Sequence, residues 1–193
     1  SALQTAAKAQ RTAGADMTWA IANPSFETGD YTGWSTTVGW DTGVKPQENG
    51  TYTTAGTDGR YLFNTWNNDA NATNSGVNAA ITQTVTGIPN GTYRLTAMVA
   101  SDNGNSLMLT GNGVTTTISA STNGAGSGVF PSVECVVTDG KLSIEVKGAN
   151  DCWYKCDDFH LTLVAPIAVE NVTLGKESAT LIEGETLSLA AVA

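Results

Sequence analysis

The stretch Lys141–Lys147, KLSIEVK, alternates apolar and polar side chains without a break. Such alternation is typical of a β-strand with one buried face and one solvent-facing face. The stretch Phe159–Leu163, FHLTL, repeats the pattern. Asp139-Gly140 directly precedes the first stretch, and an Asp-Gly pair between two alternating runs favours a two-residue hairpin. These features predict antiparallel sheet.

Further strand-like runs lie on both sides, separated by turns rich in Gly, Asn and Asp. The turn at 88–91, IPNG, has proline at one corner and an Asn-Gly pair that tolerates positive φ. Many short strands without helical crossovers predict an all-β fold, an antiparallel β-sandwich or jelly roll. The expected strands are Ala79–Val85, Thr92–Ser101, Ser106–Thr110, Val114–Ser119, Pro131–Thr138, Lys141–Lys147 and Asp157–Val164.

The chain divides into three parts that differ in composition and in hydrophobic patterning. Residues 1–15 are Ala-rich with helical spacing, and they predict a short helical or disordered segment, either a linker or the tail of a preceding domain. Residues 16–165 hold the sandwich pattern. Residues 166–193 begin with a proline and show another alternating, hairpin-like pattern that cannot bury its faces alone. We expect them to be the first strands of a truncated further domain.

The composition of the chain argues against two classes of binding partner, nucleic acids and membranes. Charged residues make up 14% of the 193 residues, and the net charge is −9. Nine Lys and Arg spread along the chain do not form the basic face that nucleic acid needs, so no nucleic-acid partner is expected. No apolar run approaches the ~20 residues that span a bilayer, so no membrane insertion is expected.

The chain has three cysteines, so at least one thiol is free. On a regular strand Cys152 and Cys156 would lie roughly 13 Å apart, too far for a disulfide. A pairing of Cys135 across strands and buried free thiols both remain open.

The aromatic residues fall into two groups. Those expected in the core are Trp19, Phe26, Trp34, Tyr93 and Phe159. The others lie in polar sequence, largely between residues 36 and 78, where strand patterning breaks down and ligand-facing loops are expected. Aromatic rings stack on the C–H face of a sugar while polar groups meet its hydroxyls. The candidate carbohydrate-binding residues are therefore Trp40, Tyr52, Arg60, Asn64, Trp66, Asn67, Asp151 and Trp153; in the alternative interpretation, the aromatic ones are lids on the core.

Three motifs occur in order: NPSFETG at 23–29 followed by Gly33-Trp34, the strand–turn–strand centre at 81–93, and WYKCDDFHL at 153–161. Together they resemble galactose-binding-like carbohydrate-binding modules of secreted bacterial glycan-degrading proteins. The resemblance covers about residues 16–165. It implies a non-catalytic module that targets a larger secreted or cell-surface bacterial protein to a polysaccharide or glycan. Segments 172–174 and 184–187 resemble the first strands of bacterial Ig-like domains, the neighbouring domain implied here.

Three carboxylates, those of Glu27, Asp157 and Asp158, are candidate ligands of a metal ion. Glu27 is expected near Asp157 or Asp158, and clustered carboxylates repel one another unless a cation lies among them. The resemblance implies a structural Ca²⁺ held by Glu27 and the closing-strand aspartate, with Asp157 favoured over Asp158. Asn23 or nearby backbone carbonyls would complete the oxygen ligands. Alternatively, Glu27 caps a turn and the Asp pair is solvated.

Catalysis is not expected of this chain. Its one histidine, His160, lies on the outward phase of a strand, and no Ser lies in a Gly-x-Ser-x-Gly turn. The cysteines lack metal-site spacing. The main alternative to carbohydrate binding is a structural spacer or adhesion domain with no glycan site; an independent hydrolase ranks third.

Overall fold

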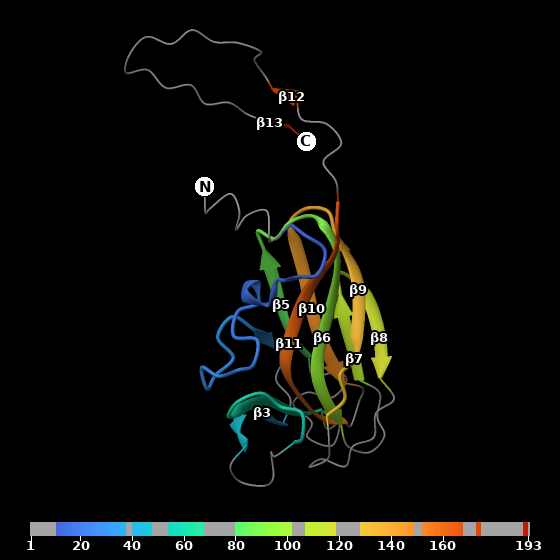
Figure 1. Ribbon diagram of the computed structural model, residues 1–193. Helices are drawn as coiled ribbons and strands as arrows, with labels where there is room; N and C mark the ends of the chain where they lie inside the picture. The colour runs from blue at the N-terminus through green and yellow to red at the C-terminus, as the bar shows by residue number, and fades with distance from the viewer. Residues whose placement is uncertain are drawn as a thin grey trace, which may run out of the picture.

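The computed structural model describes residues 11–37, 40–47, 54–67, 80–101, 107–118, 128–148, 152–167, 173–174 and 191–192. At Trp40, Trp66, Asn67, Cys152 and in the last two segments it describes the backbone only. Two antiparallel sheets pack face to face, which confirms the all-β sandwich (Figure 1). Among the described residues, no helix is long and apolar enough to cross a membrane.

The first sheet, sheet A, has six strands and is centred on the longest one, β11. Its order is β3-β4-β11-β6-β9, and β1 pairs with the C-terminal part of β11. The strands are β1 (Ala15–Asp16), β3 (Trp40–Pro46), β4 (Tyr61–Asn67), β6 (Gly91–Ser101), β9 (Ser132–Val137) and β11 (Cys152–Pro166).

The second sheet, sheet B, has five strands in the order β2-β5-β10-β7-β8. They are β2 (Ser35–Thr36), β5 (Ala80–Thr86), β7 (Leu107–Gly111), β8 (Val114–Ile118) and β10 (Lys141–Gly148). All seven expected strands are present within a few residues at either end. Two strands that were not expected, β3 and β4, lie where loops were expected.

The Asp139-Gly140 hairpin prediction is wrong. This turn connects β9 in sheet A to β10 in sheet B, so the two alternating runs never pair. The 88–91 turn likewise passes between sheets, from β5 to β6. Its expected positive φ is also absent, because Gly87, not Asn90 or Gly91, has φ +75°. The tight hairpin is instead Asn112-Gly113 between β7 and β8, where both residues have positive φ.

The core is formed by alternate residues of both sheets with an aromatic group at its centre. Phe159 lies 4.7 Å from Trp34 and 6.2 Å from Phe26, between ring centroids. Phe26, Trp34, Tyr93 and Phe159 are buried, as predicted. Burial raises the pKa of Tyr93 to about 12, and its hydroxyl donates to the Pro89 carbonyl. Cys135 and Cys156 are buried free thiols.

The prediction of Trp19 as a core residue is wrong. Trp19 is 59% exposed on the single turn of 3-10 helix, Thr18–Ala20. Met17 and Ile21, two residues away on either side, are the buried residues of this segment. Since they face the core, the ring of Trp19 between them is left at the surface.

Gly91 marks a close approach between β6 and the end of β11. A Cβ atom at this position would lie 2.6 Å from Leu163 Cδ1 and 2.7 Å from the Ala165 carbonyl oxygen. We therefore expect Gly91→Ala to lower the free energy of unfolding by about 1–3 kcal/mol through overpacking. Urea denaturation would measure it, with Thr92→Ala as the neighbouring control; equal stabilities would contradict this packing.

The described chain enters and leaves the sandwich at one end. The Gly14 amide donates to the Leu163 carbonyl, and the Ile167 amide donates to the Asn90 carbonyl. β3 lies at the opposite end (Figure 1). By itself, β12 (Thr173–Leu174) pairs antiparallel with β13 (Ala191–Val192). The Ig-like resemblance of this region remains a prediction, and the expected helical segment at 1–10 lies outside the described residues.

Candidate functional site

Strand register brings three tryptophan positions into one row. Trp40 of β3 is directly opposite Trp66 of β4, and Trp66 is directly opposite Trp153 of β11. Directly opposed residues of antiparallel strands occupy the same face of a sheet. The sequence assigned all three to loops, which is wrong, because they lie on β3, β4 and β11. Their contact with a ligand stays a prediction.

The Trp153 indole is fixed by Asn64. Its Nε1–H donates to Asn64 Oδ1 at 2.5 Å, and Asn64 Nδ2 donates to the Asp41 carbonyl oxygen at 2.9 Å. Asn64 is 0% exposed, and Trp153 is partly exposed. Asp41 in turn forms a 2.6 Å ion pair with Lys45. Asn64 is therefore a buried strand residue, whereas the sequence placed it beside a ligand-facing loop.

Lys155 lies beneath Trp153. Its Nζ is 5.0 Å from the Trp153 ring centroid and donates to Thr54 Oγ1 at 3.1 Å. The side chain is 1% exposed, and desolvation lowers its pKa to about 8. Trp153, Lys155 and Asp157 alternate with core-facing Tyr154 and Cys156. The period of two in this strand was the sequence signal that could have identified Lys155, which sequence reasoning missed.

Residues 54–60 form a strap over the outer face of sheet A, which explains why side chains on that face are buried. The Asp58 amide donates to Asp157 Oδ2 at 2.8 Å. The amides of Arg60 and Tyr61 both donate to Glu27 Oε1 at 2.8 Å. Glu27 and Asp157 therefore both hold amides of the short segment 58–61, Glu27 from loop 23–30 and Asp157 from β11.

Asp157 has an unsatisfied buried oxygen. The residue is 0% exposed, and Oδ1 has no hydrogen-bond partner. Desolvation, and to a lesser extent the nearby Asp158 and Asp58 charges, raise its pKa to about 8. A buried carboxylate of this kind is stabilised by a cation. On this observation Asp157 fits the predicted calcium ion.

Two of the other predicted metal ligands, Asn23 and Asp158, are engaged elsewhere. Asn23 Nδ2 donates to Thr28 Oγ1 and to the Asp30 carbonyl. Asp158 Oδ1 lies 2.8 Å from Nε2 of His160, which is exposed as predicted. Within the described residues, no three acidic, histidine or cysteine side chains come together as a metal-binding group. Any Ca²⁺ site would therefore depend on Asp157, Glu27 and neutral oxygens.

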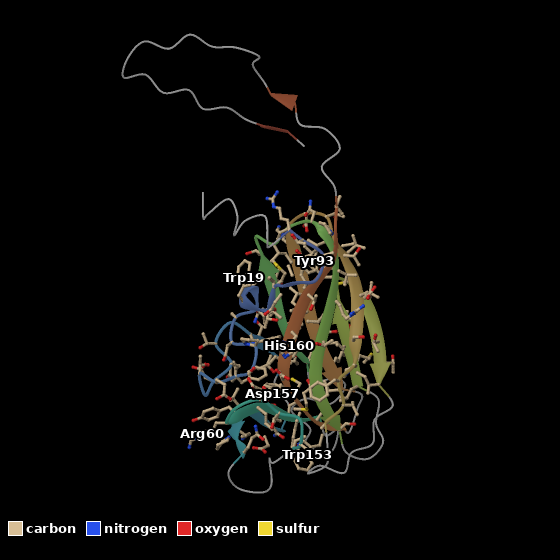
Figure 2. The ribbon with its side chains drawn as sticks, in the orientation of Figure 1. Trp19, Arg60, Tyr93, Trp153, Asp157 and His160 are labelled. Carbon is tan, nitrogen blue, oxygen red and sulfur yellow. The ribbon has the colours of Figure 1, made fainter. Side chains whose placement is uncertain are left out.

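The remaining predicted site residues are placed as follows. Arg60 is exposed, and its guanidinium lies 5.3 Å from the Tyr61 ring centroid. Figure 2 shows Arg60 and Trp153 at the end of the sandwich that carries β3, with Tyr93 toward the other end. Asn67 pairs with Cys152 in the backbone register of β4 and β11. Tyr52 and Asp151 lie outside the described residues.

Comparison with solved structures finds this sandwich in carbohydrate-binding modules. TmCBM61, solved with β-1,4-galactotriose, is 22% identical with a TM-score of 0.51, over 74% of this chain and 97% of that one. The CBM22-1 xylan-binding domain of Xyn10C from Paenibacillus barcinonensis is 16% identical with a TM-score of 0.50, over 81% and 99%. No protein-family model and no curated protein matches the chain.

A longer neighbour places the same fold beside an enzyme. The CBM22-1–GH10 modules of xylanase 10B from Clostridium thermocellum, solved with xylohexaose, are 13% identical with a TM-score of 0.50. The match covers 78% of this chain and 30% of that one. At these identities the likeness concerns the fold, which is that of carbohydrate-binding modules.

Proposed function

We propose that this protein is a non-catalytic carbohydrate-binding module whose site is the row Trp40–Trp66–Trp153. The observation that carries the proposal is the register that aligns these three positions across β3, β4 and β11. Indole rings stack on the apolar faces of sugar rings, and polar groups beside them select hydroxyl patterns. The partly exposed Asp41–Lys45 pair supplies such groups next to Trp40.

The position of the row suits an appendage of a larger protein. Trp153 is the second residue of the long strand β11, and Leu163, whose carbonyl accepts from the Gly14 amide, lies ten residues further along. At about 3.3 Å per residue these positions are on the order of 30 Å apart. A module joined through that far end would present its ligand site away from the junction and raise the local concentration of its partner glycan. From the resemblance of residues 16–165 to such modules, we also propose that it belongs to a secreted or cell-surface bacterial protein.

We further propose a structural Ca²⁺ beside Asp157 and Glu27. The buried, unpartnered Asp157 Oδ1 supports this, because a bound cation would compensate a charge that the site otherwise disfavours. When bound, Ca²⁺ supplies positive charge and coordination for oxygen ligands. Asp157 and Glu27 would hold it, and loop 23–30, the strap and β11 would be joined more firmly.

Isothermal titration with β-1,4-galactotriose and xylohexaose, extended by a glycan array, tests the binding proposal. We expect at least one glycan to bind with micromolar to millimolar affinity, and Trp19→Ala to leave that affinity unchanged. Trp19 is the matched control because its exposed ring lies outside the row. Absence of binding to every glycan would favour a structural spacer.

A further inference from the structure

The side chain of Asn64, on β4, joins Trp153 of β11 to Asp41 of the edge strand β3. Its side chain is 0% exposed, so a ligand at the surface cannot reach it. Its side-chain amide nevertheless makes two hydrogen bonds to residues of the site, one with the Trp153 indole and one with the Asp41 carbonyl. The sequence assigned it a direct ligand contact, and the burial argues for a different role.

The orientation of the Asn64 amide follows from its partners. The indole Nε1–H of Trp153 can only donate, so the group facing it must be the Asn64 oxygen. The Asp41 carbonyl can only accept, so the group facing it must be the Asn64 nitrogen, which also lies 3.3 Å from Asp41 Oδ2. Lys45 holds the Asp41 carboxylate at 2.6 Å. A chain of contacts thus runs from Lys45 through Asp41 and Asn64 to the indole.

Trp153 is restrained on a second side by Lys155. The ammonium lies 5.0 Å from the ring centroid and is itself buried, so it occupies the inner side of the ring. The indole N–H is already bonded to Asn64, and the inner side faces Lys155. The Trp153 side chain is partly exposed, and its exposed part suits stacking on sugar C–H groups and not hydrogen bonding.

We propose that Asn64 is a positioning residue, which sets the plane of Trp153 so that the ring presents one preorganised stacking face to a pyranose. This inference rests on the proposed carbohydrate function. A preorganised ring avoids the ordering cost that a mobile side chain incurs on binding. Loss of Asn64 therefore weakens binding through Trp153, without removing any contact between Asn64 and the ligand.

A double-mutant cycle separates positioning from contact. The variants are Asn64→Ala, Trp153→Phe and the double variant, titrated with whichever of β-1,4-galactotriose and xylohexaose binds the wild type. We expect Asn64→Ala to weaken binding about tenfold in the wild type and less than about threefold in the Trp153→Phe background. An equal loss in both backgrounds would make Asn64 a ligand contact, and no loss in the folded single variant would remove the positioning role.

A measurement without ligand keeps the two proposals distinguishable. Hydrogen exchange of the Trp153 indole N–H, followed by NMR, should be at least about tenfold slower than that of exposed Trp19, and Asn64→Ala should abolish the difference. If no oligosaccharide and no glycan of the array binds, the carbohydrate proposal fails while this exchange still decides the role of Asn64. If Asn64→Ala does not fold, the wild type decides, because equal exchange at Trp153 and Trp19 overturns the inference.

Discussion

Replacement of Phe159 by alanine is expected to lower the free energy of unfolding by about 3–5 kcal/mol. Phe159 is buried on β11, and its ring lies at the centre of the aromatic group with Phe26 and Trp34. Removing the ring leaves a cavity beside the rings of Phe26 and Trp34, which the surrounding packed side chains fill only in part. The aromatic contacts add roughly 0.5–1.5 kcal/mol each beyond area burial, so their loss adds to the cost.

Equilibrium unfolding in guanidinium chloride measures this effect, with His160→Ala as the matched control. His160 is the next residue on the same strand, but it is exposed, and its pairing with Asp158 is a surface contact. Surface pairs contribute about 0–1 kcal/mol. Similar stabilities for the two variants would contradict the placement of Phe159 in the core.

In the cation-free protein, stability is expected to fall as pH rises from about 5 to 7. The pKa of Asp157 is raised from 3.8 to about 8 in the folded state, so between these values the folded protein holds a proton that the unfolded chain has released. The free energy of unfolding then decreases by up to about 1.4 kcal/mol per pH unit. Lys155, whose pKa is lowered to about 8, affects the slope only above that pH.

Thermal unfolding in EDTA across this pH range, with Asp157→Asn as the control, isolates the contribution. The asparagine keeps an oxygen for the Asp58 amide but cannot titrate, so the slope should flatten. Added Ca²⁺ should stabilise the wild type by about 2.7 kcal/mol at one hundred times its Kd, and should not stabilise the variant. An unchanged slope in Asp157→Asn would contradict the assignment; no response of the wild type to Ca²⁺ would contradict the calcium site.

Much of the sandwich was predictable from local pattern. β10 and the second half of β11 have one core-facing and one outward face, so their alternation is visible in the sequence. β4 is different, because its residues Leu62–Thr65 are buried in succession. The strap covers the outer face there, so both faces are buried and alternation disappears. At Lys155 the alternation of β11 persists and places this residue on the face of Trp153, but no local signal shows that the strap covers that face.

The sequence alone proposed the residues of the candidate site, but it could not predict how they are arranged in space. Trp40, Trp66 and Trp153 lie far apart in the sequence, and only the pairing of β3, β4 and β11 brings them into one row. Local pattern could not establish that pairing, just as it could not show that β9 and β10 belong to different sheets. The bond between Trp153 and Asn64 spans 89 positions and has no local signal.

The most direct test of the site is the affinity of Trp66→Ala for a glycan that the wild type binds, measured by isothermal titration. Trp66 is the central position of the row, opposite both Trp40 and Trp153. If the row is the binding site, this variant should remain folded and bind at least about tenfold more weakly, a loss of roughly 1.4 kcal/mol or more. Wild-type affinity in folded Trp66→Ala would show that the glycan binds elsewhere on the sandwich.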